Sequence, residues 1–334
     1  MPSAPFCPSR IYVDRAVLDQ PLTQKILRRF QQVPTFIMDD PKQLKKPAEM
    51  TWAKKGLLLT WLKPDPIKEF KAMSQSVGHS YYSADLVSNC HLECTYCILQ
   101  SYLGNNPLMT VYTNQDEIFE RMKRQLMQLP LGAVVGTGKI ADSLAIEEIT
   151  GYAAALVRLF ANQSRALLEL KTKSNRIEPL VGLEHRGETV ISWSLNPPAL
   201  IQAEEYKTAS FEERILAAKT VSERGYPVGF HLDPIIAHAD WKKNYQEVFK
   251  TVFSCLEERQ IAWLSLGTLR FPMRQARLMR KRFPKNRSVL ERLVSTNRKT
   301  VHYPEELKEE MLDWFQDRLG QYLPSNKIYR CMDF

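Results

Sequence analysis

Apolar runs of strand length alternate with amphipathic segments of helical length over most of the chain. After residue 80, runs that fit strands cover residues 83–87, 131–135, 166–173, 188–195, 227–232 and 261–269, and segments with helical periodicity cover 146–162, 211–225 and 241–259. Strands separated by helices in this way are typical of parallel βαβ units. We therefore predict an α/β fold built on an incomplete (β/α)6 barrel, whose ligands bind at the carboxyl ends of the strands.

The first 80 residues follow a different pattern. Short strands are predicted at residues 11–13, 35–38 and 56–61, a helix at 23–32, and a loop over the Lys-rich stretch 63–71. The resulting domain prediction is a small N-terminal α/β region over residues 1–80, a partial barrel over 81–270, and a basic segment with a helical tail over 271–334.

The composition changes this picture little. Of the 334 residues, 44% are hydrophobic and 25% are charged, as in ordinary globular enzymes. No apolar run approaches the roughly 18 residues that a membrane span requires, and the N-terminal residues lack the hydrophobic core of a signal peptide. We expect a cytoplasmic protein without a membrane partner.

The net charge of +9 is concentrated in one segment. Between Arg270 and Lys299 there are eleven Lys or Arg residues and a single acid, Glu291, so the rest of the chain is close to neutral. Such a local excess is typical of a surface that binds a polyanion, although a solvated helix face gives the same pattern. We predict that this segment binds DNA or RNA. The candidate contacts are Arg270, Arg274, Arg277, Arg280 and Arg282.

Three of the six cysteines lie in one short segment directly after the first predicted barrel strand. Cys90, Cys94 and Cys97 have the spacing C-x3-C-x2-C. Three thiolates so placed can bind three irons of a 4Fe–4S cluster and leave the fourth iron open to a small molecule. A zinc site is one alternative, but zinc usually takes four protein ligands, and His91 is too close to Cys90 to supply the fourth. Unliganded core cysteines are the other alternative.

This cysteine spacing resembles that of the radical SAM superfamily. The resemblance implies that the open iron binds S-adenosylmethionine (SAM) and that reductive cleavage of SAM yields a 5′-deoxyadenosyl radical. It also implies polar groups at neighbouring strand ends that hold SAM. The candidates are Thr137 and Gly138, which otherwise form an ordinary tight turn, Lys173, which is otherwise a surface lysine, and Ser194 and Asn196, which otherwise cap a turn.

Further segments resemble the spore photoproduct lyase family, whose radical SAM enzymes split a thymine–thymine photoproduct in DNA. The resemblance extends thinly over nearly the whole chain. It is densest at residues 94–100 and continues at 103–104, 111–114, 172–173, 194–196, 217–219, 225–230, 241 and 245. It implies the radical SAM type of incomplete TIM-like barrel. Lys173 and Ser194 match SAM-contacting positions of the family, and Thr137 and Gly138 lie near a third.

Two departures from the family concern the hydrogen atom that is returned to the product radical. Repairing members have a hydrogen-donating cysteine at the strand end where this chain has Gly136, and a second relay tyrosine where it has Ile98. Neither glycine nor isoleucine can donate this hydrogen atom. The candidate donors are therefore Tyr96, beside the cluster, and Cys331, in a tail that can fold over the open end of the barrel.

Three functions are compatible with these patterns. The first is a lyase that repairs thymine photoproducts in DNA, and the second is a radical SAM enzyme that modifies RNA or a small molecule. The third is a non-enzymatic Fe–S protein that binds nucleic acid. Both enzymes require a reducing electron donor such as flavodoxin or ferredoxin.

Overall fold

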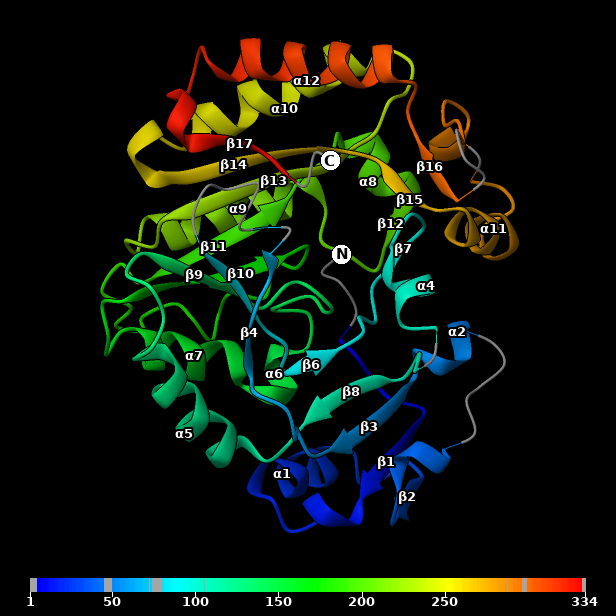
Figure 1. Ribbon diagram of the computed structural model, residues 1–334, viewed down its shortest axis with the longest axis vertical. Helices are drawn as coiled ribbons and strands as arrows, with labels where there is room; N and C mark the ends of the chain where they lie inside the picture. The colour runs from blue at the N-terminus through cyan, green and yellow to red at the C-terminus, as the bar shows by residue number, and fades with distance from the viewer. Residues whose placement is uncertain are drawn as a thin grey trace.

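Two larger β-sheets organise the chain, a five-stranded sheet near the N-terminus and an eight-stranded sheet that forms the barrel wall (Figure 1). The structure is a computed structural model that describes residues 5–44, 50–71, 73, 80–104, 106–286, 288–295 and 299–331. None of the helices in these ranges combines the length and the apolar character that a bilayer-spanning helix needs.

The five-stranded sheet has the order β2-β1-β3-β8-β6. Its strands are β1 (Arg10–Asp14), β2 (Thr35–Met38), β3 (Gly56–Thr60), β6 (Val87–Ser88) and β8 (Met109–Tyr112). Ile11 and Leu57 on its central strands are fully buried and belong to the same core cluster as Ile26 of α1 (Pro21–Arg29). The three strands predicted in the first 80 residues are confirmed, as is the helix that follows the first of them.

The barrel sheet has the order β17-β14-β13-β11-β10-β9-β5-β4. Its strands are β4 (Ile67–Glu69), β5 (Tyr81–Ala84), β9 (Ala133–Gly136), β10 (Ala166–Thr172), β11 (Thr189–Ser194), β13 (Val228–Ile235), β14 (Ile261–Thr268) and β17 (Ile328–Arg330). The six strands from β5 to β14 are parallel and follow the order of the chain, which confirms the predicted incomplete (β/α)6 barrel. β17 extends the parallel arrangement beyond β14.

Two local strand predictions are wrong. The stretch 63–71 is not entirely loop, because β4 lies within it and pairs in antiparallel fashion with β5. The first barrel strand is Tyr81–Ala84 rather than 83–87, since Val87 enters the five-stranded sheet beside β8. Strands this short show too few alternations to be recognised from the sequence. Two antiparallel ribbons complete the strands: β7 (Glu93–Cys94) with β12 (Glu205–Tyr206), and β15 (Arg270–Pro272) with β16 (Thr300–His302).

Helices cover the outside of the barrel sheet, with α10 and α12 together at one end of the molecule (Figure 1). The helices besides α1 are α2 (Met50–Ala53), α4 (Leu99–Tyr102), α5 (Gln115–Leu126), α6 (Glu147–Thr150), α7 (Tyr152–Phe160), α8 (Pro198–Glu204), α9 (Phe211–Ser222), α10 (Trp241–Cys255), α11 (Met273–Arg282) and α12 (Glu305–Leu319). The single helix predicted at 146–162 is in fact α6 and α7, because Gly151 between them has a left-handed φ of +69°. The predicted helical tail is α12.

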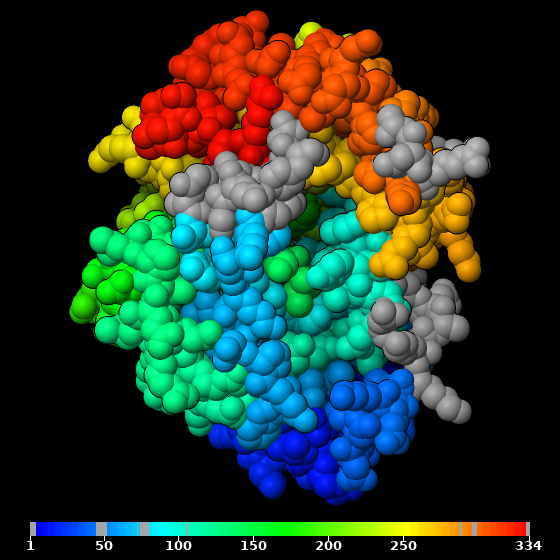
Figure 2. All heavy atoms as spheres, in the orientation of Figure 1, coloured from blue at the N-terminus to red at the C-terminus, as the bar shows by residue number. Residues whose placement is uncertain are grey.

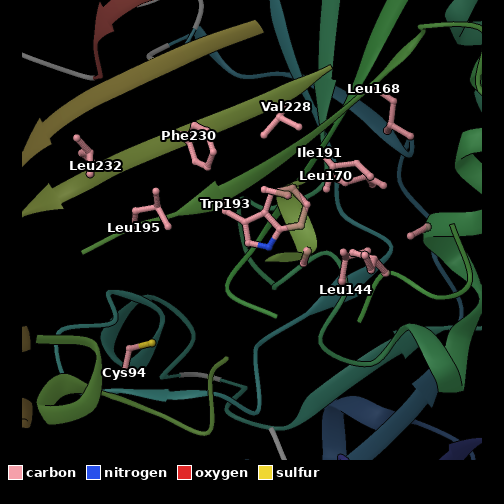
Figure 3. Packing of buried hydrophobic residues seen from close by; sticks show 14 of the residues in the cluster. Cys94, Leu144, Leu168, Leu170, Ile191, Trp193, Leu195, Val228, Phe230 and Leu232 are labelled. Carbon is pink, nitrogen blue, oxygen red and sulfur yellow. The ribbon is translucent and has the colours of Figure 1, made fainter. Parts of the chain in front are cut away.

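The two faces of the barrel strands carry different side chains. On the face that packs into the main core lie Leu168, Leu170, Ile191, Trp193, Val228 and Phe230 (Figure 3). The alternate positions face the barrel interior, where hydrogen bonds join Glu169, Ser192, His231 and Ser265. Because successive residues of a strand point to opposite faces, an apolar outer wall encloses a polar interior.

The two edges of the barrel sheet approach each other. Met73 follows β4 and Cys331 follows β17, and their sulfur atoms are 3.7 Å apart. Both residues belong to one small buried cluster with Tyr81 and Val134. The sheet is therefore strongly curled, and the end of the described chain lies against the first barrel strands.

The two sheets exchange strands across residue 80. β6 and β8 come from beyond that residue and join the N-terminal sheet, whereas β4 comes from before it and joins the barrel sheet. β17, from the C-terminal segment, is also a barrel strand. The division of the chain into regions at residues 80 and 270 therefore stays a prediction.

Glu147 gives the fold a specific pH dependence. Its carboxylate is buried and accepts hydrogen bonds from the backbone N–H groups of Ala153 and Ala154 at 2.8 and 3.0 Å. Burial nevertheless raises the pKa of Glu147 from 4.5 to about 7. A group whose pKa is raised by folding stabilises the fold below its unfolded pKa. This stabilisation is lost as the pH rises from 4.5 through about 7.

The Glu147→Gln substitution should remove this pH dependence, because a neutral amide does not ionise. Between pH 4.5 and pH values above about 7, the stability of the variant relative to the wild type should increase. The relative gain in free energy of unfolding should reach at most about 3 kcal/mol. Urea denaturation of both proteins at the two ends of this range measures the difference. Parallel pH curves would contradict the role assigned to Glu147.

Candidate active site

The three clustered cysteines lie in the loop between β6 and α4. The middle of this loop is held by β7, which pairs with β12 from the segment that follows β11 and α8. Gln100 of α4 holds it from the other side, because its Nε2 donates to the carbonyls of Cys94 and Thr95 at 3.1 and 2.9 Å. These contacts use only backbone groups of the loop, and the three cysteines form no disulfide.

The basic helix α11 braces the same loop. Gln275 donates to the carbonyl of Cys97 at 2.8 Å, and Arg274 donates to a carbonyl of α4. Arg282 forms an ion pair with the buried Glu93, with 2.6 Å between nitrogen and oxygen. Figure 2 shows the teal segment that carries the cysteines beside the yellow and orange segment that includes α11. Arg270 on β15 donates to the carbonyl of Cys331 at 3.3 Å, so three of the five arginines predicted to bind nucleic acid have partners within the protein.

All three thiols line one cavity of about 620 Å³ at the carboxyl ends of the barrel strands. Cys90 and Cys94 are buried, whereas Cys97 is partly exposed. Burial raises the pKa of both buried thiols, to about 12 for Cys90. Iron must displace these protons, so assembly of a cluster at this site releases protons.

The arrangement of the cysteines fits a cluster and does not fit a single metal ion. In the part of the chain that the structure describes, no three His, Cys, Asp or Glu side chains are close enough to share one ion. His91, the extra ligand of the zinc alternative, does not line the cavity, and its ring packs against Phe6. In a 4Fe–4S cube each thiolate binds a different iron. Three separate thiols around one cavity meet this requirement.

Three of the five predicted SAM contacts line the same cavity, namely Gly138, Lys173 and Ser194. A Cβ at Gly138 would lie 2.6 Å from the Cβ of Lys171, so a larger residue could not approach β10 this closely. Thr137 is not part of the lining, and its hydroxyl shares a hydrogen bond with Ser143 at 2.6 Å. Asn196 also lies outside the lining, behind the cavity wall.

Glu205 is a buried carboxylate in that wall, and no pattern in the sequence indicates its role. Its Oε1 accepts hydrogen bonds from Lys173 at 3.2 Å and from Asn196 at 3.0 Å, and Tyr96 also donates to it. Arg214 donates to Oε2 at 2.7 Å. Burial alone would raise the pKa of Glu205, but the cations of Arg214 and Lys173 hold it well below its usual range. Glu205 thereby fixes the side chains of Tyr96 and Lys173 at the cavity wall.

A second buried network, centred on Glu169, forms the inner part of the cavity. Tyr81 donates to Oε2, while His231 and Ser192 donate to Oε1 at 2.7 and 2.9 Å. Burial raises the pKa of Glu169, but the charge and hydrogen bond of His231, the charge of Lys171 and the bond from Tyr81 outweigh this and bring it to about 2. The sequence signal for this network is Glu169 itself, a charged residue within the largely apolar strand β10.

The remaining predicted residues fall into two groups. Cys331, which is 2% exposed, and Arg270 line the cavity together with the cluster cysteines. Arg277 and Arg280 point to solvent from α11. The structure therefore brings the tail cysteine to the predicted active site and leaves two of the five arginines on an open surface.

Fold and site together define the class of protein. A curled half-barrel whose strand ends surround a three-cysteine loop is the architecture of a radical SAM enzyme. The family model of spore photoproduct lyase matches residues 6–330, so the chain belongs to the spore photoproduct lyase family. Members of this family are DNA-repair lyases. This chain is therefore a radical SAM lyase of that type, with a 4Fe–4S cluster and SAM as cofactors, and the non-enzymatic interpretation is wrong.

Individual relatives agree with this membership. The chain is 26% identical to the spore photoproduct lyase of a Geobacillus species over 289 residues, which cover 85% of this chain and 84% of the relative. It is 24% identical to that of Bacillus subtilis over 297 residues, or 86% and 85% of the two chains. A solved spore photoproduct lyase variant with bound AdoMet and dinucleoside spore photoproduct aligns with a TM-score of 0.85 at 24% identity. It covers 98% of this chain and 99% of that one. The predicted fold class is confirmed.

Proposed function

We propose that this enzyme repairs thymine photoproducts in DNA and converts them back to two thymines. The observation that carries the proposal is the cavity, in which the cluster cysteines, Lys173, Ser194 and Cys331 face one space. The dinucleoside photoproduct named for the solved relative supports a nucleic-acid substrate rather than a small metabolite. We assign the reaction to the cytoplasm, with flavodoxin or ferredoxin as electron donor, because the three cluster thiols must stay reduced.

Within this function, Cys90, Cys94 and Cys97 hold the cluster. When bound, the cluster and SAM supply a 5′-deoxyadenosyl radical that can abstract a hydrogen atom from the substrate. Lys173 offers its ammonium to the SAM carboxylate, and Ser194 offers a hydroxyl. Gly138 allows the backbone to approach the ligand. Thr137 and Asn196 position these groups from behind the wall, since Asn196 shares Glu205 with Lys173.

The Lys173→Ala substitution should weaken SAM binding about tenfold to a hundredfold, the value of a hydrogen bond to a charged group. Arg214 continues to neutralise Glu205 in this variant, so the wall should stay intact. Equilibrium dialysis with labelled SAM measures the affinity, and the visible spectrum reports the cluster. Lys139→Ala is the matched control, because Lys139 also borders the cavity but lies over the Phe70 ring. Equal SAM affinities for both variants would contradict the assignment.

In this proposal, nucleic acid binds the enzyme at the rim of the cavity and along α11. Arg270 borders the cavity, and Arg277 and Arg280 extend a positive surface away from it. Cations at this density neutralise phosphates and release counterions, so binding depends strongly on salt. Arg274 and Arg282 contribute to the same positive potential while they brace the cysteine loop.

Changing Arg277 and Arg280 together to Gln should weaken DNA binding and reduce its dependence on salt. The slope of log affinity against log salt should fall by about 0.9 for each phosphate of double-stranded DNA that the variant no longer neutralises. Fluorescence anisotropy over a salt series measures the slope. Arg28→Gln with Arg124→Gln is the matched control, since both side chains are exposed on helices α1 and α5, which lie away from α11 (Figure 1). An unchanged slope would mean that Arg277 and Arg280 contact only solvent and bind no phosphate.

Two residues are candidates for returning the hydrogen atom. Tyr96 faces the cavity, but its hydroxyl already donates to Glu205 and accepts from Lys173 and Asn196 at 3.2 Å each. Cys331 follows β17, an edge strand of the barrel sheet, and also lines the cavity. Both have an X–H bond weak enough to quench a carbon radical, whereas Gly136 and Ile98 have none.

The test of the proposed function is the restoration of thymine. Anaerobically reconstituted enzyme, SAM and dithionite are incubated with the dinucleoside photoproduct and with DNA that contains it. Chromatography should show thymine formation that depends on SAM. If SAM is cleaved without release of thymine from either substrate, the proposal fails, and an RNA or small-molecule substrate becomes the next to test.

A further inference from the structure

Tyr81 fills the space that a side chain at Gly136 would need. A Cβ built on Gly136 overlaps the phenol oxygen of Tyr81 and lies 2.8 Å from its Cζ. The two residues come from β5 and β9, which pair directly in the barrel sheet. The phenol is thus wedged against the end of β9, and it lines the cavity that contains the cluster cysteines.

Tyr81 also has a proton acceptor in place. Its hydroxyl donates to Glu169, which is ionised because its pKa lies at about 2. A phenol that loses an electron becomes a far stronger acid than a carboxylic acid. Its proton can then move along the existing hydrogen bond to the carboxylate. The pair is therefore built for loss of an electron and a proton together.

Cys331 brings a thiol into the same buried cluster. It packs with Tyr81, Met73 and Val134 and lines the cavity. Burial, together with the neighbouring carboxylate of Asp233, raises the pKa of Cys331 well above its usual value, so the sulfur keeps its hydrogen. Cys7 and Cys255, the described cysteines that lie elsewhere, do not line this cavity.

We propose, on the basis of the photoproduct-repair function above, that Cys331 gives a hydrogen atom to the substrate radical and that Tyr81, with Glu169 as its base, then reduces the resulting thiyl radical. In the first step the S–H bond of Cys331 breaks and a C–H bond forms on the substrate. In the second step an electron passes from Tyr81 to the sulfur, and the phenolic proton moves to Glu169. Because the pKa of Cys331 is raised and that of Glu169 is low, the sulfur then takes up a proton and Glu169 releases one, which restores the thiol and the carboxylate. The total charge is unchanged, and the unpaired electron rests on Tyr81.

Tyr81 donates to Glu169 and Tyr96 donates to Glu205, and the other partners of these two carboxylates explain why Tyr81 rather than Tyr96 serves this step. Tyr96 donates to Glu205, whose protonation would weaken its ion pairs with Arg214 and Lys173. Glu169 accepts instead from hydroxyl, indole and imidazole groups. Protonation of Glu169 therefore breaks no ion pair with a neighbouring Lys or Arg among the described residues. Tyr96→Phe is accordingly the comparison for Tyr81→Phe in the photo-oxidation of the resting protein, which needs no turnover.

Electron paramagnetic resonance on freeze-quenched holoenzyme with the dinucleoside photoproduct tests the second step. A tyrosyl signal is expected in the wild type, in Tyr226→Phe, which changes a buried tyrosine outside the cavity, and in Cys255→Ala. Its loss is expected in Tyr81→Phe and Cys331→Ser. Tyr81→Phe keeps the ring beside Gly136, and Cys331→Ser nearly keeps the side-chain volume, so both should fold. Circular dichroism checks this.

Two further readouts separate the steps. In deuterated water the thiol becomes S–D, so repaired thymine should carry deuterium in the wild type and lose it in Cys331→Ser. Flash photo-oxidation of the resting protein, without SAM or substrate, should give a tyrosyl absorption that falls in Tyr81→Phe but not in Tyr96→Phe.

The inference is overturned if deuterium transfer survives in Cys331→Ser, if the wild type gives no tyrosyl signal, or if Tyr81→Phe retains that signal. Restored thymine in the same samples would leave the proposed function intact. Failure of the wild type to restore thymine overturns the proposed function instead, and the photo-oxidation experiment still tests the Tyr81–Glu169 pair.

Discussion

Replacement of Cys94 by alanine should reduce SAM cleavage to background. Cys94 is the middle cysteine of the loop that we propose holds the cluster, lies on β7 and lines the cavity. A cluster that loses one of its three thiolates is not held by the two that remain. Anaerobically reconstituted wild-type protein should contain about four irons and four sulfides per chain, and the variant far fewer. Iron and sulfide analysis measures the cluster, and chromatography of 5′-deoxyadenosine measures SAM cleavage.

Cys255→Ala is the matched control for this experiment. Cys255 ends α10, is partly exposed and does not line the cavity. Its removal should leave the iron content and the cleavage rate unchanged. Full SAM cleavage by Cys94→Ala would falsify the assignment of the cluster to this loop.

A cysteine introduced at Gly136 should destabilise the protein rather than provide a hydrogen donor. The new Cβ would overlap the phenol oxygen of Tyr81, so the ring must move and its hydrogen bond to Glu169 must break. Overpacking costs about 1–3 kcal/mol, and loss of a buried hydrogen-bond partner costs about the same. The free energy of unfolding should therefore fall by about 2–6 kcal/mol in Gly136→Cys. Urea denaturation of the apoprotein measures this loss.

The double variant Gly136→Cys with Tyr81→Ala separates steric overlap from other effects. Removal of the phenol makes room for the new side chain, so the double variant should be more stable than the sum of the two single losses indicates. Residues in direct contact show such non-additivity, whereas independent sites do not. Strictly additive losses would mean that Tyr81 does not limit the space at Gly136.

The features that sequence analysis predicted correctly all depend on local patterns. Three cysteines within eight residues must lie together whatever the rest of the chain does, so their position around one cavity could be predicted from their spacing. The six parallel strands could be predicted because each has enough apolar residues to define a run, and βαβ connections leave few possible topologies. β4 has only three residues, and a strand of that length carries no such pattern.

Part of the active site could not be predicted, because it depends on contacts between distant segments. Glu205 meets Lys173, which is 32 residues away in the chain, only in the folded protein. Arg274 and Arg282 belong to a basic run that indicates a surface, yet α11 packs on α4 and turns both toward the loop. A charge pattern along one segment contains no information about which of its side chains another segment will cover.

The positions of Tyr81 and Cys331 show most clearly which features the sequence determines and which depend on the tertiary structure. The absence of a side chain at Gly136 is visible in the sequence, but the phenol that fills the space comes from the neighbouring strand. The sequence likewise contains Cys331, but only pairing of β17 with β14 and curling of the sheet bring its sulfur to Met73 and the cavity. Sequence spacing determines which residues share a loop or a strand. Closure of the barrel, a long-range packing event, determines which of them face the same cavity.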